Sequence, residues 1–375
     1  MKKLLVPMLE AGAGHKMPAL AVKEALDRLY PGEVQVDVVD FVREVGALKT
    51  DHFLKHSWDI ALAHPLLARM GYRFADSFWP FSVYYYRYGF PDFVTKAMKY
   101  LELYKPDLIF STNYVTSIIA SQARKKLSLS VPVISFVTDP FDAFGWWVDP
   151  ALDRIFVASE KAKQQLLRRH IPEDKITQVA FPIQAKFSDP KPNLEVLRHS
   201  LGLEAGVPTL LTSEGGQGIG KISGFVMELY KQNYPCNIIS VCGKNEELRG
   251  ELQHLIENTP SRTRLIPLGF VSNMHELLAL SDLCVAKAGA STMYEALLSG
   301  VPIIFTSWAT YNEKPNIDYC ISQGIGWYAP DFPQFSRILA NLLSGSALET
   351  AKAKIKSLQL RSGSEEIARL LRSYL

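Results

Sequence analysis

Short apolar runs alternate with longer amphipathic stretches along the whole chain. In the first half, five runs of strand length are rich in Val, Ile, Leu and Phe, and they are residues 3–9, 34–40, 108–111, 131–138 and 154–158. Helical periodicity occupies much of the sequence between them, for instance residues 16–29. Buried strands that alternate with helices are typical of a parallel sheet wrapped by helices. The first half is therefore predicted to be a domain of this kind.

The second half repeats the pattern with five more strand-like runs, each followed by a helix-like stretch. These runs are residues 209–212, 237–242, 263–268, 283–286 and 302–306. The predicted fold class is α/β, with two Rossmann-like doubly wound domains facing a cleft, and 375 residues suit two such domains. A polar, proline-containing stretch at 187–193 indicates a linker. We expect the first Rossmann-like domain at 1–186, the second at 187–345, and C-terminal helices at 346–375 that could cross back to the first domain.

Residues 48–105 interrupt the first domain with helical sequence that is dense in aromatic residues and broken at Pro65, Pro80 and Pro91. Lysines and arginines are interleaved with the rings, a combination that a lipid headgroup interface favours. The simpler interpretation is that the rings only pack this insertion onto its own domain. Against it, the consecutive Tyr84, Tyr85 and Tyr86 would spread over about 200° of a helix and cannot all face one core. We therefore predict that the insertion docks on a membrane.

Within the insertion, Trp79, Tyr85 and Arg87 are the residues that we expect to contact lipid. The charge balance agrees with an anionic surface but excludes strong nucleic-acid binding, since the net charge is only +3. No run approaches the roughly 18 apolar residues of a membrane-spanning helix. The apolar start is broken at Pro7, which indicates a first strand and not a signal peptide. We expect a cytoplasmic protein bound peripherally to the inner face of the plasma membrane.

The four cysteines are Cys236, Cys242, Cys284 and Cys320, none of them in C-x-x-C spacing. Most of them lie in apolar, strand-like runs. Buried free thiols are therefore expected, and disulfides or a zinc site are not.

Two glycine-rich turns, at 10–15 and 214–220, each connect a predicted strand to a predicted helix. Such turns let backbone N–H groups approach a charged ligand. The dinucleotide fingerprint fails at both, because Met17 and Lys221 stand where its third glycine belongs. Residues 215–221 come close to a phosphate-binding P-loop, but Ile222 replaces its Mg²⁺-binding Ser or Thr. A nucleotide-hydrolysing protein stays open as an alternative of another class.

Ordered sequence blocks over most of the chain resemble one family of enzymes. The blocks are Gly-Ala-Gly-His at 12–15, Thr-Asp-Pro at 138–140 with Trp-Trp at 146–147, Phe-Pro-Ile at 181–183, Ser-Glu-Gly-Gly-Gln-Gly at 213–218, Val-Cys-Gly-Lys-Asn at 241–245, Gly-Phe-Val at 269–271, Lys-Ala-Gly-Ala-Ser-Thr at 287–292, Glu-Ala at 295–296, Gly-Val-Pro-Ile-Ile at 300–304 and Asn-Glu-Lys-Pro-Asn at 312–316. Together they resemble the monogalactosyl- and glucosyl-diacylglycerol synthases, including processive diacylglycerol glycosyltransferases, which are related to the peptidoglycan lipid GlcNAc transferases.

In the first domain, the resemblance and the residue chemistry point to His15 and Asp139. His15 follows the first strand, and an imidazole that titrates near neutrality can remove the proton of an acceptor hydroxyl, so it is predicted to be the general base. Asp139, after another strand, is expected to orient His15 or to contact the acceptor. Gly14 is expected in the turn beside the ligand.

In the second domain, the resemblance implies a complete nucleotide-sugar site. Ser291 and Thr292 open a helix after Gly289, where its dipole can stabilise a diphosphate. Glu295 is expected to bind the ribose hydroxyls, and the pair Glu313 and Asn316 the donor sugar. The remaining predicted binding residues are Gly216, Gln217 and Gly218 of the second glycine-rich turn, and Phe270 and Val271 around the uracil base.

The predicted function is inverting transfer of a hexose from a UDP-sugar to a lipid acceptor, most simply diacylglycerol. A related transferase that uses a polyprenyl-linked or soluble acceptor is the alternative among enzymes. The chain contains no Asp-x-Asp motif, so we expect no catalytic metal and no other cofactor. The donor could carry glucose, galactose or GlcNAc.

Overall fold

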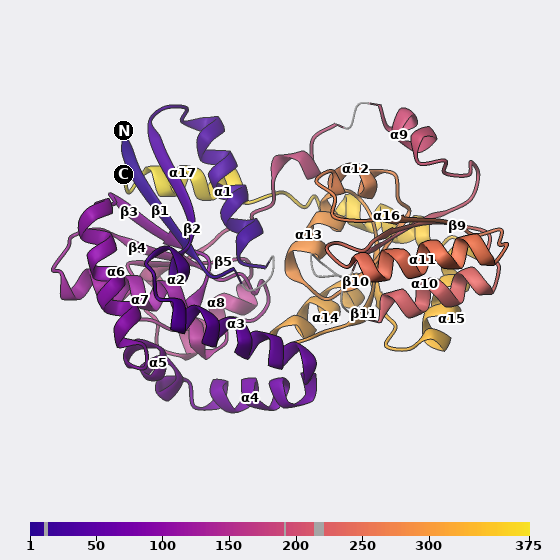
Figure 1. Ribbon diagram of the computed structural model, residues 1–375. Coiled ribbons are helices and arrows are strands. Elements are labelled where there is room, and N and C mark those ends of the chain that lie inside the picture. Colours follow the sequence, from indigo (N-terminus) through magenta and orange to yellow (C-terminus); the bar gives the residue numbers. More distant parts are fainter. Residues whose placement is uncertain (11–13, 191–192, 214–220) are drawn as a thin grey trace. The chain divides into compact units, whose positions relative to one another are not determined.

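Two units, each built on its own parallel six-stranded sheet, form the protein in the computed structural model (Figure 1), which describes residues 1–10, 14–190, 193–213 and 221–375. The first unit contains Met1–Ala185, Ala309–Asn312 and Ser362–Leu375, and the second contains Lys186–Trp308 and Glu313–Arg361. Helices flank both sheets. The predicted α/β class with two Rossmann-like domains is confirmed.

The strand order in the first sheet is β2-β1-β3-β4-β5-β6. Its strands are β1 (Lys2–Met8), β2 (Val34–Asp40), β3 (Leu108–Ser111), β4 (Val133–Phe136), β5 (Arg154–Val157) and β6 (Ile176–Gln178). The central strands β3 and β4 are buried along their whole length, which explains why they read as continuous apolar runs and not as alternating ones. The last strand was not predicted from the sequence, since three residues at a sheet edge give almost no pattern.

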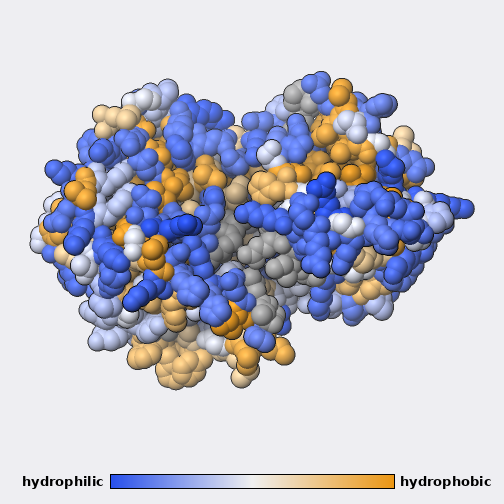
Figure 2. Space-filling view, in the orientation of Figure 1, coloured by the Kyte–Doolittle hydropathy of each residue, from blue (hydrophilic) through white to orange (hydrophobic). Residues whose placement is uncertain are grey.

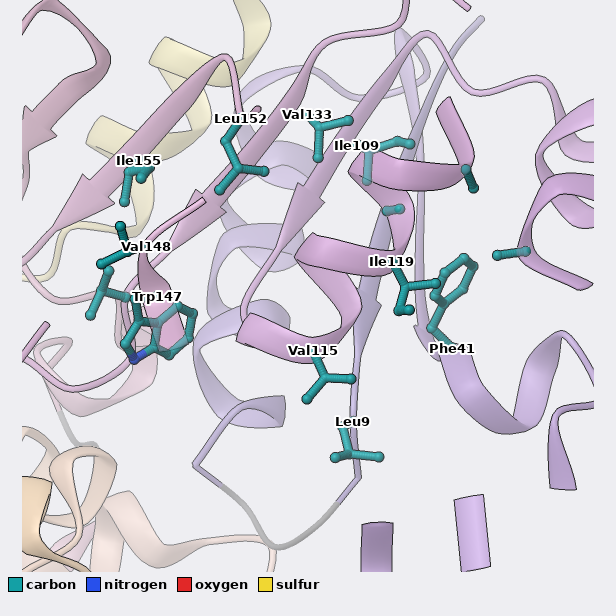
Figure 3. Close-up of a cluster of buried hydrophobic side chains, with 14 of the residues drawn as sticks. Leu9, Phe41, Ile109, Val115, Ile119, Val133, Trp147, Val148, Leu152 and Ile155 are labelled. Atoms are coloured by element: carbon teal, nitrogen blue, oxygen red, sulfur yellow. The ribbon is translucent and has the colours of Figure 1, made fainter. Parts of the chain in front are cut away.

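Helices pack on both faces of this sheet and enclose its core. They are α1 (Lys16–Leu29), α2 (Phe41–Glu44), α7 (Tyr114–Lys126), α8 (Glu160–Arg168) and α17 (Ser364–Arg372), with short 3₁₀ turns η1 (Gly145–Trp147), η2 (Glu173–Lys175) and η3 (Ala185–Phe187). Figure 3 shows part of the core, in which β3, β4, β5 and α7 contribute apolar side chains to the same cluster as the buried Val148 and Leu152, the contributors being Ile109, Val133, Ile155, Val115 and Ile119. The indole of Trp147 belongs to the same cluster.

The C-terminal helix α17 belongs to the first unit and packs on α1 (Figure 1). Ile367, Ala368 and Leu371 bury the apolar face of α17 completely. The chain enters this helix through Gly363, where an added Cβ would lie only 1.8 Å from the Ala180 carbonyl oxygen. Only glycine allows so close an approach of two backbone segments.

The insertion consists of four helices, α3 (Leu48–Ala63), α4 (Pro65–Ser77), α5 (Trp79–Tyr88) and α6 (Pro91–Tyr104). Each of its three prolines lies at the first or second position of a helix, where the missing N–H costs no hydrogen bond. The prolines therefore set where these helices begin. Among the helices that the structure describes, none is long and apolar enough to cross a membrane.

The second sheet has the order β12-β11-β10-β7-β8-β9. Its strands are β7 (Thr209–Ser213), β8 (Asn237–Val241), β9 (Arg264–Leu268), β10 (Leu283–Lys287), β11 (Ile303–Ser307) and β12 (Gly326–Tyr328). The helices of this part are α9 (Leu194–Ser200), α10 (Ile222–Lys231), α11 (Glu246–Asn258), α12 (Met274–Ala279), α13 (Ala290–Leu298), α14 (Lys314–Gln323), α15 (Phe332–Ser344) and α16 (Ala347–Ser357). The short η4 (Tyr311–Glu313) lies at the boundary in the chain between the two units. The four cysteines are free and buried, as expected.

Candidate active site

His15 lies at the carboxyl end of the first sheet, between β1 and α1. It is the N-cap residue of α1, but its side chain makes no capping hydrogen bond. Its Nδ1 instead lies 2.7 Å from the Thr112 carbonyl oxygen and 3.0 Å from the Thr138 hydroxyl. Thr112 follows β3 and Thr138 lies two residues after β4. Ligands of open α/β sheets bind at this edge, where the carboxyl ends of neighbouring strands meet.

The contact with Thr112 fixes the tautomer of the imidazole. A carbonyl oxygen can only accept a hydrogen bond, so Nδ1 carries the proton and Nε2 keeps a lone pair. Burial lowers the pKa of His15 to about 4, opposed by the hydrogen bond to Thr112. The expectation of a ring that titrates near neutrality was therefore wrong for this state. The imidazole is neutral at physiological pH, which is the form that a base requires.

The carboxylate of Asp139 accepts hydrogen bonds from residues other than His15. Its Oδ2 accepts a hydrogen bond from Trp147 Nε1 at 2.9 Å, and its Oδ1 accepts one from the Asn312 amide. The hydrogen bonds that orient His15 come from Thr112 and Thr138 instead. The sequence could have indicated Thr138 as a partner of His15, since it precedes Asp139 in the Thr-Asp-Pro block at 138–140. The Thr112 contact uses a backbone oxygen and leaves no signal in the sequence.

Aromatic rings surround the base. The Trp147 ring centroid is 6.3 Å from that of His15, and the Tyr114 ring stands edge-on at 6.5 Å. The ring centroid of Tyr86, on α5 of the insertion, lies 5.5 Å from that of Tyr114 and 5.3 Å from that of Trp146. The insertion therefore reaches the ring that lies directly against the predicted base.

Two polar contacts fasten the insertion to the segment that carries Trp147. Asp76, on α4, accepts hydrogen bonds from the Gly145 N–H at 2.6 Å and from Arg169 at 2.7 Å. Arg87, on α5, forms an ion pair with Asp149, which is only 1% exposed. The prediction that Arg87 contacts lipid was wrong, because a buried carboxylate holds its guanidinium.

Trp79 also faces inward. Its Cβ occupies the space beside Gly145, where a second Cβ would lie at 2.0 Å. Its side chain packs on the core of the first unit, so the prediction that it contacts lipid was wrong as well. Of the three expected contacts, only Tyr85 is exposed.

In the second unit, polar side chains gather where β10 leads into α13. Gly289 is the N-cap of α13, and Ser291, in the first turn, is buried, with no partner for its hydroxyl oxygen among the described residues. Thr292 is partly exposed beside it. Glu295, one turn further on, is buried, and burial raises the pKa of its carboxyl to about 8, opposed by the charge of Lys186. No hydrogen bond holds this carboxyl among the described residues.

Asn316 connects this helix start to a distant part of the sequence. It lies on α14, and its amide donates to the Ala288 carbonyl at 2.8 Å, which leaves its Oδ1 buried and without a partner in the part that the structure describes. Glu313 is the N-cap of α14. The sequence did not point to Thr306, near the end of β11, whose hydroxyl oxygen is buried and likewise has no partner among the residues that the structure describes. Buried polar groups are normally hydrogen-bonded, so such a cluster is suited to a polar ligand.

The other predicted binding residues are placed less closely. Phe270 follows β9 with its ring 71% exposed, and Val271 is partly buried beside it. Gly14 precedes His15 and has open space where a Cβ would stand. Gly216, Gln217 and Gly218, together with most of the near-P-loop, lie outside the described residues. Elsewhere, in the part that the structure describes, no three His, Cys, Asp or Glu side chains are grouped as metal ligands.

Two family models match different parts of the chain. Residues 15–183 match the monogalactosyldiacylglycerol (MGDG) synthase family, and residues 216–316 match the glycosyltransferase family 28 C-terminal domain. The first match begins at His15, and the second contains the helix start with Ser291 and Glu295.

Similar proteins agree with these matches. The probable monogalactosyldiacylglycerol synthase 2, chloroplastic, of Oryza sativa subsp. indica is 25% identical over 368 residues, which cover 96% of this chain and 77% of that protein. The processive diacylglycerol beta-glucosyltransferase of Staphylococcus carnosus is 27% identical over 357 residues, covering 91% and 84%. The S. aureus MnaA–UDP co-structure has the same fold, with a TM-score of 0.63 and 17% identity over 100% of this chain and 97% of that one.

The matches support an enzyme that transfers sugars over one that hydrolyses nucleotides. The chain is a glycosyltransferase whose first part resembles the monogalactosyldiacylglycerol synthases and whose second part resembles the family 28 C-terminal domain.

Proposed function

We propose that this glycosyltransferase moves a hexose from a UDP-sugar to the hydroxyl of diacylglycerol at a membrane surface, with inversion at C1. The observation that carries the proposal is the fixed tautomer of His15, whose Nε2 is left as a neutral base at the carboxyl end of the first sheet. The relatives named for diacylglycerol and monogalactosyldiacylglycerol support the acceptor.

In the proposed step, the acceptor oxygen forms a bond to C1 of the sugar while the bond from C1 to the UDP oxygen breaks. The acceptor proton moves to His15 Nε2, and UDP leaves with the electron pair. Attack from the face opposite the leaving group inverts the configuration. A positioned base of this kind contributes about 10²- to 10⁴-fold to the rate.

The donor assignment is supported by the second unit. The start of α13 offers backbone N–H groups, a positive dipole end and the Ser291 hydroxyl, which no other described residue binds, and these groups suit a diphosphate. The carboxyl of Glu295 suits the two ribose hydroxyls, and Asn316 and Glu313 the sugar. The exposed ring of Phe270 suits stacking on uracil. The helix dipole also lets us propose that the leaving diphosphate is stabilised without a metal or other cofactor.

The membrane assignment is supported by an exposed apolar surface on α4. Leu66, Leu67, Met70 and Phe74 are between 66% and 73% exposed. Figure 2 shows apolar side chains gathered at the lower edge of the first unit, in the region of α4 in Figure 1. The helix is amphipathic, since Tyr72 and Asp76 on the same helix contact Phe144 and Gly145 of the body. Such a face suits the headgroup boundary of a bilayer, here proposed to be the cytoplasmic leaflet.

A direct assay tests the reaction. Purified enzyme is supplied with radiolabelled UDP-glucose, UDP-galactose or UDP-GlcNAc and with vesicles that contain diacylglycerol, and the anomeric configuration of the product is read by NMR. We expect one donor to give a β-linked glycolipid and His15→Ala to lower kcat by about 10²- to 10⁴-fold with UDP affinity nearly unchanged. The exposed His254 provides the control, as His254→Ala. Full turnover by His15→Ala would remove the proposed base.

Vesicle flotation tests the membrane surface separately. The variant Leu67→Ser/Met70→Ser/Phe74→Ser should lose binding to anionic vesicles and keep UDP affinity. Its control changes two equally exposed apolar residues elsewhere, Leu103→Ser and Val196→Ser. Equal flotation of both variants and the parent would exclude this face as the docking surface.

A further inference from the structure

The hydroxyl of Thr138 holds a position that in many hydrolytic sites belongs to a carboxylate. In Ser-His-Asp triads, an acidic side chain accepts from Nδ1–H and stabilises the imidazolium. Here His15 Nδ1 faces two oxygens, the Thr112 carbonyl at 2.7 Å and Thr138 Oγ1 at 3.0 Å. Thr138 is 95% buried, with 5% of its surface exposed. The nearest acidic residue in sequence, Asp139, accepts from Trp147 and Asn312.

Thr112 and Thr138 hold His15 through different hydrogen bonds. The Thr112 hydroxyl donates to the His15 backbone carbonyl at 2.8 Å, while the Thr112 carbonyl accepts from the ring. Thr112 therefore fixes both the backbone and the tautomer. Since Nδ1 carries the proton, Thr138 Oγ1 is the second acceptor of a shared N–H. It is the one side-chain atom, among the described residues, that bonds to the ring.

A second acceptor matters most when the ring becomes charged. As Nε2 takes a proton, positive charge spreads over the ring and strengthens each hydrogen bond from Nδ1–H. The other titratable neighbour, Tyr114, stands edge-on to the ring, and burial holds its pKa well above its usual value, so it stays neutral. Trp147, the second ring beside His15, is neutral, and its indole N–H donates to the Asp139 carboxylate.

We propose that Thr138 is a positioning residue for His15, whose hydroxyl oxygen stabilises the imidazolium as the acceptor is deprotonated. This inference rests on the proposed role of His15 as the base. It concerns a residue that does not itself touch the reacting atoms, so its effect should appear in kcat and in the pH profile.

Three variants test the proposal in the full-length enzyme. Thr138→Val keeps the shape and removes the acceptor, while Thr138→Ser keeps the acceptor. Thr116→Val is the matched control, because Thr116 is also a buried threonine, and its hydroxyl donates to the Pro7 carbonyl at 3.0 Å, away from the ring. We measure kcat, the KM for the UDP-sugar and the dependence on pH of kcat at saturating UDP-sugar.

We expect Thr138→Val to lower kcat by about 10- to 100-fold with an unchanged KM for the donor, as loss of a hydrogen bond to a charged group does. The acid limb of its pH profile should move to lower pH, since the imidazolium loses a stabilising contact. Thr138→Ser should stay within about threefold of the parent. A merely structural loss would lower activity without moving the limb.

Two outcomes would overturn the proposal and leave the proposed function standing. If Thr138→Val matches Thr116→Val in kcat and in the position of the acid limb, while His15→Ala is inactive, the base stands and Thr138 has no role in it. If Thr138→Ser falls as far as Thr138→Val, the oxygen is not the relevant atom. Full activity of His15→Ala would instead show that the proposed function has failed.

Discussion

The binding of UDP is predicted to release a proton from Glu295. Burial raises the pKa of this carboxyl to about 8 in the free protein, so at pH 7 it is protonated in about nine of ten molecules. The two ribose hydroxyls are best bound by the charged form, which accepts from both. Deprotonation at pH 7 then costs about 1.4 kcal/mol, which is one unit of pKa. UDP affinity should therefore be about tenfold weaker at pH 7 than at a pH well above 8.

UDP affinity should increase with pH because the pKa of Glu295 is raised. A carboxyl with a raised pKa holds its proton as the pH rises through neutrality, so affinity that depends on the carboxylate grows until the pH exceeds about 8. Without the raised pKa, the carboxylate would already be formed at pH 6. Affinity would then be flat across the neutral range.

Isothermal titration calorimetry from pH 6 to pH 9 measures this dependence. The variant Glu295→Gln is titrated in parallel, because the ratio of the two affinities cancels the ionisation of the UDP phosphate. Two buffers of different ionisation enthalpy at pH 7 report the released proton, which we expect to be about 0.9 per UDP. Glu247→Gln, on the exposed face of α11, is the control. Affinities of parent and Glu295→Gln that run parallel with pH would refute the charged ribose contact.

Three further predictions follow from the same structure. The pKa of His15 is lowered to about 4, so kcat at saturating UDP-sugar should stay level down to about pH 5 and fall only as the pH approaches 4; a limb near 6.5 would contradict this. Arg87→Met leaves the buried Asp149 without its partner and should lower the free energy of unfolding by about 3 kcal/mol in urea denaturation, whereas Lys23→Met, which breaks an exposed pair with Asp27, should cost under about 1 kcal/mol. EDTA should leave the initial rate unchanged, and a loss that Mg²⁺ or Mn²⁺ restores would show a metal requirement.

The sequence alone established the fold class and the main chemical groups. Most strands of the two parallel sheets are buried and therefore rich in apolar residues, so ten of the twelve described strands could be recognised by composition. A strand, a turn and a helix in succession also determine that His15 stands at a sheet edge and that Ser291 lies in the first turn of a helix. These are short-range consequences of chain order, which is why they could be predicted.

Other features were decided only when distant segments came together. The orientation of His15 depends on the Thr112 carbonyl oxygen. Every residue has a backbone carbonyl, so the residue type at this position could not indicate the contact. The pKa values of His15 and Glu295 arise from burial, which is a property of the packed unit. Asn316 reaches Ala288 only because α14 packs beside the end of β10.

The insertion shows most clearly what could not be predicted from the sequence. Its composition correctly predicted exposed apolar residues, because the consecutive tyrosines cannot all face one core. Which residues face outward depends on the partners available to each helix face. Asp149 pairs with Arg87 and Gly145 leaves room for Trp79, whereas Leu66, Leu67, Met70 and Phe74 of α4 stay exposed, as do rings of α5 such as Phe81 and Tyr84. A helix has the same periodicity whichever side is buried, and only the tertiary structure chooses the side.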